Sequence, residues 1–457
     1  MNVLLLEESN YTAALSIVRA LGRLGHRVTT AAPSETPAMC SRWCSNRIIS
    51  PSSSRPEQYV EFVSTVVERG EYDLAFICDD PVIGAISRNR EALPGRTDFM
   101  LPPPESFEIA RSKLESQRFA AKLGVPTPRT LDLDSPERLH AAVEELGFPF
   151  VIKDSEGFGA RHVRYIANAE ELREAQRNLA TARFRGRPMA QEFVQGSAND
   201  VYMTQVLYRH GEPLFVCSHR KLRQFPLHGG TTARGVTVRE PQLDAQVLQI
   251  FSALHWHGPA KADFKRDVRD GSFKLMELDP RVGASYEISM AAGSNLVDLC
   301  CRMVAGEPVQ PQLTYARGAR MRLLCYDILC LAARPRLLPA FVLDTLNPRV
   351  RSDFDWGDIP GTWALLRRGV WIFDDALRNG RITGEAFQVV SAPSVGRRAH
   401  RLALMLIRGG FACPRWLYRA SKRLLRRRPM VEAKRGDDDR GVTAAAESGS
   451  RGKGGVR

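Results

Sequence analysis

The sequence lacks the features of a membrane-spanning or secreted protein. None of its 457 residues belongs to an uninterrupted apolar run of about 18 or more, so a transmembrane helix is not expected. The N-terminal segment MNVLLLEESN places two glutamates directly after a short apolar run, which is typical of a first β-strand and not of a signal peptide. These absences predict a cytoplasmic protein.

The cysteines follow no regular spacing pattern. The nine cysteines include the close pair Cys40 and Cys44 and the adjacent pair Cys300 and Cys301, but no paired CxxC motifs. An odd number without a pattern is typical of buried thiols in a reducing compartment and argues against a zinc site. No internal repeat is visible either.

Acidic residues are scarcer than basic ones. The formal net charge is +14 and the pI about 9.6, although much of the basic excess lies near the C-terminus. A basic balance permits nucleic acid, an anionic membrane surface or phosphorylated substrates as partners. With 44% hydrophobic and 25% charged residues, the composition is that of a soluble globular protein. The length allows roughly two to four domains.

The order of apolar segments predicts four regions. Strand and helix patterns alternate over residues 1–104, which indicates a parallel sheet covered by helices. The break LPPP at its end precedes a second α/β region, residues 105–310. Residues 311–428 are expected to form a helical, basic extension. Residues 429–457 are rich in Gly, Ser, Ala and charge and are expected to be disordered.

The segment LMELDPRVGAS, residues 275–285, carries the strongest chemical signal. Glu277, Asp279 and Arg281 stand at alternate positions just after an apolar strand, so their side chains are expected on one face. Paired carboxylates favour a hard cation such as Mg²⁺, and an arginine suits phosphate. A polar strand end with a surface ion pair explains these residues equally well when they are taken alone.

Three further positions extend this signal. Lys153 ends an apolar strand before DSEGFGAR, where a lysine beside a glycine loop can hold phosphate oxygens; an exposed lysine in a hairpin turn is the alternative. Asp263 lies on the first strand of a hairpin whose second strand carries Glu277, which brings the two carboxylates to about 5 Å. Asp79 and Asp80 follow a strand end, where ligands bind in α/β sheets, but a helix N-cap explains them at least as well.

The order of these features resembles that of the ATP-grasp superfamily over residues 1–305. The resemblance implies an α/β (α+β) ATP-grasp fold, with a Rossmann-like domain before the ATP-grasp domain and its two subdomains. It is closest to the carboxylate–amine ligase and carboligase-like branch, partly because of SHRKLRQFPLHGGTT at 218–232. The motifs that carry it are Lys113 before the GVPTP turn at 124–128, Lys153 with its glycine loop, QEFV at 191–194, and the hairpin ending in Glu277, Asp279 and Arg281.

The resemblance also implies roles for individual residues. Phosphates of ATP would be bound by Lys113 and Lys153, with Lys221 and Arg220 lining the acceptor or phosphate side. The adenine hinge would comprise Gln191, Glu192, Phe193 and Val194, and Asp200 would lie near the ribose. Asp263, Glu277 and Asp279 would hold Mg²⁺, with Mn²⁺ as a second candidate ion. The residues implied in catalysis are Arg281, Lys153 and Arg220.

The sequence departs from the superfamily pattern in three places. Asp279 stands where the superfamily has Asn, which retains an oxygen ligand and adds negative charge. The loop 154–161 has only two glycines, Gly157 and Gly159, which predicts a less flexible lid. Asp263 is slightly farther from Glu277 than the pattern implies, which puts the first metal ligand in doubt.

The implied activity is that of an ATP-dependent ligase. It would activate a carboxylate as an acyl-phosphate and join it to an amine, with segments 154–161 and 223–235 as candidate lids. The substrates would be small or polymer-linked carboxylates and amines. The alternative is a catalytically inactive ATP-binding protein that regulates or scaffolds at a membrane. A biotin-type carboxylase is disfavoured because no biotin carrier segment is evident.

The segment 397–428 is basic and amphipathic. Its aromatic and aliphatic residues lie among arginines, which suits an anionic membrane surface and a peripheral position at the inner membrane. A helix packed on the body with a solvated basic face is the equal alternative. Nucleic acid is not expected, because no aromatic platform accompanies the charge. The superfamily also suggests a homodimer.

Overall fold

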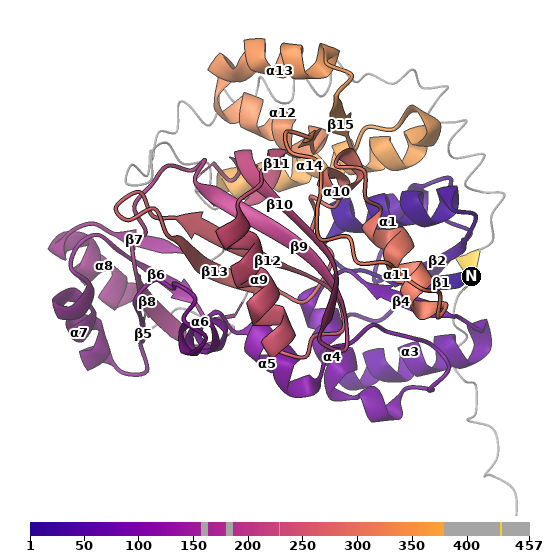
Figure 1. Ribbon diagram of the computed structural model, residues 1–457, viewed down its shortest axis with the longest axis horizontal. Coiled ribbons are helices and arrows are strands. Elements are labelled where there is room, and N and C mark those ends of the chain that lie inside the picture. Colours follow the sequence, from indigo (N-terminus) through magenta and orange to yellow (C-terminus); the bar gives the residue numbers. More distant parts are fainter. Residues whose placement is uncertain (157–162, 180–185, 228, 379–429, 432–457) are drawn as a thin grey trace, which may run out of the picture.

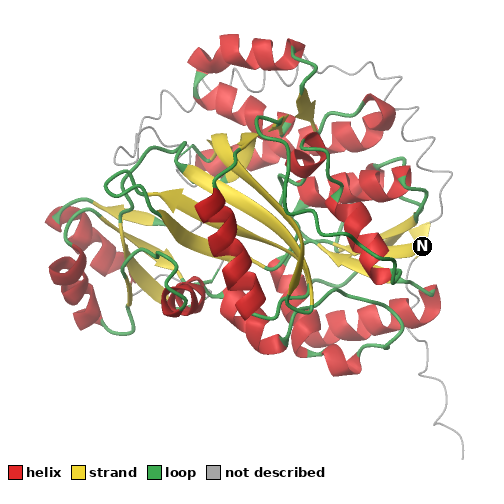
Figure 2. Ribbon diagram, viewed as in Figure 1, coloured by secondary structure: helices red, strands yellow, loops and turns green. Residues whose placement is uncertain are grey.

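The computed structural model comprises three β-sheets surrounded by helices (Figures 1 and 2). Each sheet contributes one wall of the cavity described below. No helix of the described part of the chain is long and apolar enough to cross a membrane. The structure describes residues 1–156, 163–179, 186–227, 229–378 and 430–431.

The first sheet is parallel and has the order β16-β3-β2-β1-β4. Apolar residues of its central strands are fully buried between helices α1 and α3, as strand–helix alternation predicts. Because β1 and β4 are neighbours, the loops after their carboxyl ends lie together. The bounds are β1 Asn2–Leu6, α1 Tyr11–Arg23, β2 Arg27–Ala32, α2 Pro37–Cys40, β3 Asn46–Ile49, α3 Pro56–Gly70, β4 Leu74–Ile77, α4 Asp80–Arg88 and β16 Met430–Val431.

The second sheet has four antiparallel strands in the order β5-β8-β6-β7. Helices α7 and α8 cover one face and bury Phe150 and Ile152 of β6 (Figure 1). Since side chains alternate along a strand, Val151 and Lys153 project from the other face into the cavity. The bounds are β5 Thr130–Asp132, α7 Pro136–Leu146, β6 Phe150–Asp154, β7 Arg164–Ile166, α8 Ala169–Leu179 and β8 Pro188–Glu192.

The third sheet has the order β13-β12-β9-β10-β11-β14-β15. Helix α9 crosses one face and packs on Tyr208 and Phe264, whereas Met203 and Asp263 line the cavity from the other face (Figure 1). The bounds are β9 Val201–Arg209, β10 Glu212–Phe225, β11 Thr231–Thr237, α9 Pro241–Ala253, β12 Gly258–Arg266, β13 Phe273–Asp279, β14 Arg320–Arg322 and β15 Val350–Ser352.

The remaining helices include two places where neighbouring helices are separated by a break. The stretch 104–122 forms two helices, because Ser112 is extended and its hydroxyl caps the second one by accepting from Glu115 N at 3.3 Å. The helical stretch 287–304 is likewise interrupted before Asn295, the N-cap of α11. The bounds are α5 Pro104–Arg111, α6 Lys113–Lys122, α10 Glu287–Ala291, α11 Leu296–Val304, α12 Leu324–Ala333, α13 Leu338–Leu346 and α14 Ile359–Arg378.

The region after residue 311 is not purely helical. Strands β14 and β15 extend the third sheet, and each has only three residues, too short for an alternating pattern to show. Met430 and Val431 pair with β3 as a strand, which an entirely disordered tail does not predict. The segment 397–428, with its expected membrane contact, lies outside the described residues.

Candidate active site

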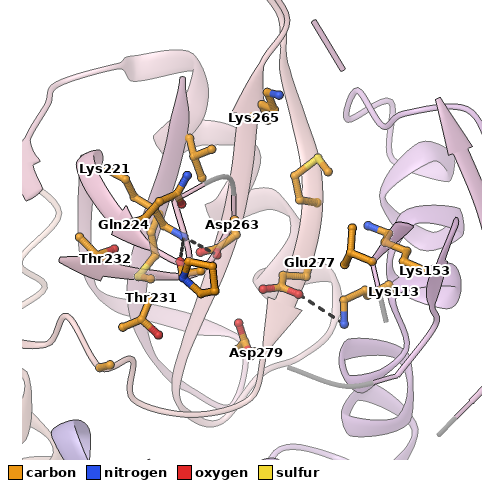
Figure 3. Close-up of a pocket in the computed structure, with 18 of the residues that line it drawn as sticks. Lys113, Lys153, Lys221, Gln224, Thr231, Thr232, Asp263, Lys265, Glu277 and Asp279 are labelled. Atoms are coloured by element: carbon orange, nitrogen blue, oxygen red, sulfur yellow. Dashed lines mark hydrogen bonds and ion pairs between the residues drawn. The ribbon is translucent and has the colours of Figure 1, made fainter. Parts of the chain in front are cut away.

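A cavity of about 490 Å³ lies between the three sheets. Its walls include the ends of β1 and β4, the open face of the second sheet and the open face of the third. Figure 3 shows the part where lysines from different elements face the carboxylates of β12 and β13. Predicted site residues that line it are Lys113, Lys153, Gln191, Glu192, Phe193, Val194, Lys221, Asp263, Glu277, Asp279 and Arg281.

The hairpin β12–β13 gathers the carboxylates. Asp263 and Glu277 are direct cross-strand partners, and Asp279 is opposite Lys261. The prediction that this hairpin brings Asp263 to Glu277 is confirmed. All three carboxylates line the same cavity (Figure 3).

Lys261 is one of the site residues that the sequence reasoning missed. Its ammonium group pairs with Asp279 and lies 3.6 Å from Asp263 Oδ1. Burial alone would lower the pKa of Lys261, but the neighbouring carboxylates of Asp263 and Asp279 raise it above its usual value. The available signal was its place two residues before Asp263, on the same face of the strand.

The charges on both aspartates are held by basic neighbours. Lys221 Nζ lies 3.1 Å from Asp263 Oδ2. Burial tends to raise the pKa of Asp263, yet Lys221 and Lys261 lower it below its usual value. The pKa of Asp279 is likewise pushed up by burial and brought below its usual value by Lys261 and Arg281. Both carboxylates are therefore ionised.

Arg281 joins the acidic hairpin to the first sheet. Its Nε donates to Asp80 Oδ1 at 2.6 Å, and its Nη2 to Asp279 Oδ1 at 3.1 Å. Burial works against the charged form, but Asp80 and Asp279 raise the pKa of Arg281 above its usual value. Asp80 begins α4, and Asp79 accepts hydrogen bonds from the backbone of residues 8–10. Asp79 occupies the N-cap position of α4, but its side chain makes no capping hydrogen bond, so the pair holds the loop after β1 and Arg281 instead.

Two lysines stand opposite Glu277. Lys113 Nζ is 3.4 Å from Glu277 Oε2, and the Lys113 backbone N–H donates to Ser155 O at 2.7 Å. Lys153 is buried, and burial together with the charge of Lys113 lowers its pKa to about 7, although Glu277 opposes the shift. A buried ammonium of this kind gains most from a phosphate beside it.

The predicted hinge lies at the end of β8. The strand ends at Glu192, so Phe193 and Val194 lie beyond its ladder. The Gln191 amide donates to Gln117 Oε1 at 2.9 Å, and Glu192 accepts from Lys274 at 2.6 Å. These two side chains are therefore engaged with neighbouring residues of the protein. The Phe193 ring lies 4.8 Å from Lys265 Nζ and 6.0 Å from the Tyr165 ring.

Two predicted residues are not brought to the cavity. Arg220 alternates with Lys221 along β10 and is absent from the cavity lining. Asp200 instead accepts from Ser197 N at 2.6 Å and closes a local turn. A β-bulge beside Arg223 turns Gln224 into the cavity in place of a strictly alternating residue.

The N-terminal end of the cavity contains residues that no sequence signal marked. Arg368 of α14 lies over the Tyr11 ring, with Cζ 4.6 Å from the ring centroid, and donates to the Tyr11 hydroxyl at 3.1 Å. Tyr326 of α12 also lines this end. The region after residue 311 therefore contributes to the site.

The donor set fits one hard cation in the presence of phosphate. Among the described residues, no three or more His, Cys, Asp or Glu residues are arranged to hold a metal on their own. Mg²⁺ commonly takes one or two carboxylates together with substrate phosphates. Glu277, which faces Lys113 and Lys153, meets that need. Asp263 and Asp279 lie beside it as predicted, but with Lys261 between them.

The comparisons with known proteins agree with this geometry. Residues 112–312 match the family model described as "Carbamoyl-phosphate synthase L chain, ATP binding domain". Residues 112–312 form an ATP-grasp domain. The predicted ATP-grasp fold is thereby confirmed.

Individual relatives of the ATP-grasp domain are distant. The N-terminal section of the carbamoyl phosphate synthase large chain of Methanopyrus kandleri is 25% identical over 221 residues, covering 46% of this chain and 39% of that protein. This chain thus spans well under two thirds of that relative. The biotin carboxylase domain of the Hydrogenobacter thermophilus 2-oxoglutarate carboxylase, solved as a dimer with MgADP and bicarbonate, has a TM-score of 0.56 at 18% identity, covering 70% and 73% of the two chains. The L-amino acid ligase of Bacillus licheniformis has a TM-score of 0.51 at 20% identity, covering 69% and 75%.

Proposed function

We propose that the protein is an ATP-dependent ligase that activates a carboxylate as an acyl-phosphate and joins it to an amine. The observation that carries this proposal is the convergence of Lys113, Lys153 and Arg281 on the carboxylates of the ATP-grasp hairpin. Such a constellation suits a phosphoryl group in transfer, because charge spreads over its oxygens and cations stabilise it. The matched family model, an ATP-binding domain, supports the nucleotide.

The residues have separable roles in this reaction. The substrate carboxylate oxygen attacks the γ-phosphorus, and the bond from that phosphorus to the β–γ bridging oxygen breaks, releasing ADP. Lys113 and Lys153 hold the phosphates, and Arg281 stabilises the transferred group. Glu277 would hold Mg²⁺ together with the phosphates, and the ion would supply further neutralisation of charge. The amine nitrogen then attacks the acyl carbon, the carbon–oxygen bond to phosphate breaks, and the amine loses a proton.

The acyl-phosphate must be protected from water. The segment 223–235, a candidate lid, contributes Gln224, Gly230 and Thr231 to the cavity lining. Residue 228 of that segment and most of the other candidate lid, 154–161, lie outside the described residues. The end of the cavity near Tyr11 and Arg368 is the candidate position for the acceptor, because both residues lie outside the matched ATP-binding domain, residues 112–312.

The test is ADP formation that requires Mg²⁺, a carboxylate and an amine together. A screen of amino acids as substrates, with and without cell-envelope extract, would identify the pair. Lys153→Ala and Glu277→Ala should abolish turnover, whereas Lys122→Ala, an exposed lysine at the end of α6, should not change it. Turnover by both site variants at the parental rate would refute the assignment.

A catalytically inactive ATP-binding scaffold makes a different prediction. It would bind nucleotide without turnover for every acceptor pair. Two further features remain predictions: a peripheral membrane contact through 397–428 and a homodimer. Vesicle binding lost on truncation after residue 396 would support the first, and the mass of the particle in solution would test the second.

A further inference from the structure

Lys261 lies where the sequence predicts a metal ion. Its ammonium group pairs with Asp279 Oδ2 and lies 3.6 Å from Asp263 Oδ1. These are two of the three carboxylates predicted to bind Mg²⁺. A cation that is covalently part of β12 is therefore already in place between them.

The position of Lys261 is fixed by packing as well as by charge. The residue is 5% exposed, and it is the direct cross-strand partner of Asp279. The chain passes so close at Gly283 that a Cβ there would lie 2.9 Å from Lys261 Cδ. Because Gly283 has no side chain, the aliphatic part of the Lys261 side chain can occupy the space beside it. Lys261 is thus a built part of the site and not a surface lysine folded inward.

The charge around Asp263 and Asp279 is balanced without a metal. Lys221 Nζ lies 3.1 Å from Asp263 Oδ2, and Arg281 Nη2 lies 3.1 Å from Asp279 Oδ1. With Lys261, three cationic groups therefore face two carboxylates. A divalent ion between these carboxylates would sit beside Lys261 in a region with little water, where like charges repel strongly.

Glu277 has a different environment. Its side chain is 28% exposed, and Lys113 lies 3.4 Å away, on the side of the phosphate-binding lysines. One carboxylate with phosphate oxygens is a donor set that Mg²⁺ accepts. The position at Glu277 therefore remains open to an ion that arrives with the nucleotide.

We infer that Lys261 is a built-in cation that takes the place of a divalent ion between Asp263 and Asp279, so that the site binds one divalent ion per nucleotide and not two. Lys261 is a positioning residue: it orients Asp279, which in turn holds Arg281. This inference rests on the proposed function, since it concerns the ion that accompanies ATP.

The test measures how many divalent ions each chain binds and does not depend on turnover. The full chain is titrated with Mn²⁺ in the presence of ADP, and free Mn²⁺ is followed by electron paramagnetic resonance. The parent should bind about one Mn²⁺ per chain beside the nucleotide. Lys261→Met, which keeps the length and removes the charge, should bind about two, because two carboxylates then lack their bridging cation. Spin coupling between the two ions would show that they are neighbours.

Two further variants show whether the number of bound ions depends on the position of the Lys261 charge or only on the total number of cationic groups. Lys221→Met also removes a cation from Asp263 but leaves Lys261 between the carboxylates, so its count should stay at that of the parent. Lys261→Arg should restore the parental count. The inference is overturned if the parent binds two Mn²⁺ ions, or if folded Lys261→Met binds the same number of ions as the parent. If Lys261→Met does not fold, the number of ions bound by the parent still tests the inference. No ADP binding by the parent would overturn the proposed function and the inference with it.

Discussion

Lys153 provides a prediction whose size follows from the structure. Burial and the neighbouring charge of Lys113 lower its pKa to about 7, far below the ordinary value of 10.5. A bound phosphate stabilises the ammonium form and raises the pKa again. Nucleotide binding near pH 8 should therefore be accompanied by uptake of a proton on Lys153.

The magnitude follows from linkage. At pH 8 a lysine with a pKa of about 7 is roughly 10% protonated, so binding should take up about 0.9 proton. The lysine must be charged in the complex, so affinity is highest below the free-state pKa and is lost as the pH rises through it. The dissociation constant for ADP should rise about fivefold from pH 7 to 8 and about ninefold from pH 8 to 9.

The assay is isothermal titration calorimetry of ADP at pH 8 in two buffers with different ionisation enthalpies. The slope of the observed enthalpy against the buffer enthalpy gives the number of protons taken up. Lys153→Arg is the matched control, because its guanidinium stays charged across this range and should show neither proton uptake nor the loss of affinity. A parent protein with no proton uptake and a pH-independent affinity, or an arginine variant that behaves like the parent, would refute the reasoning.

Two other substitutions test the charge network. Asp279→Asn keeps an oxygen beside Lys261 and Arg281, so the rate of ADP formation should fall by less than about tenfold, whereas Lys153→Ala should abolish it. The check is the rate of both variants at saturating Mg²⁺. Inactivity of a folded Asp279→Asn variant would show that the charge of Asp279 is required. Asp80→Ala leaves Arg281 with one carboxylate in a largely buried position, so the free energy of unfolding in urea should fall by about 2–4 kcal/mol. The control is Glu108→Ala, which removes an exposed partner of Arg88 and should lower the free energy of unfolding by less than about 1 kcal/mol. An equal loss of stability in both variants would show that burial of the Arg281–Asp80 pair has no effect.

Local sequence was sufficient for part of the acidic hairpin. The period of two in a strand places Glu277 and Asp279 on one face, but a register shift between Asp263 and Phe264 decides that Asp263 lies opposite Glu277. The same local rules predicted that Lys153 ends a buried strand. The role of Arg220 came from the resemblance, and it conflicts with these rules, because alternation from Lys221 places Arg220 on the other face. The rules themselves fail at Gln224, because a bulge breaks the alternation.

The partners of these residues were decided by the tertiary structure. Arg281 meets Asp80, which is 201 positions away, and Arg368 meets Tyr11, which is 357 positions away. Such contacts depend on how three sheets are packed around one cavity, and no local pattern encodes that. The sequence by itself determined which charges lie on each strand. Only the packing decided that Arg281 would meet Asp80 and that Arg368 would meet Tyr11, since these pairs form where distant segments of the chain are brought together.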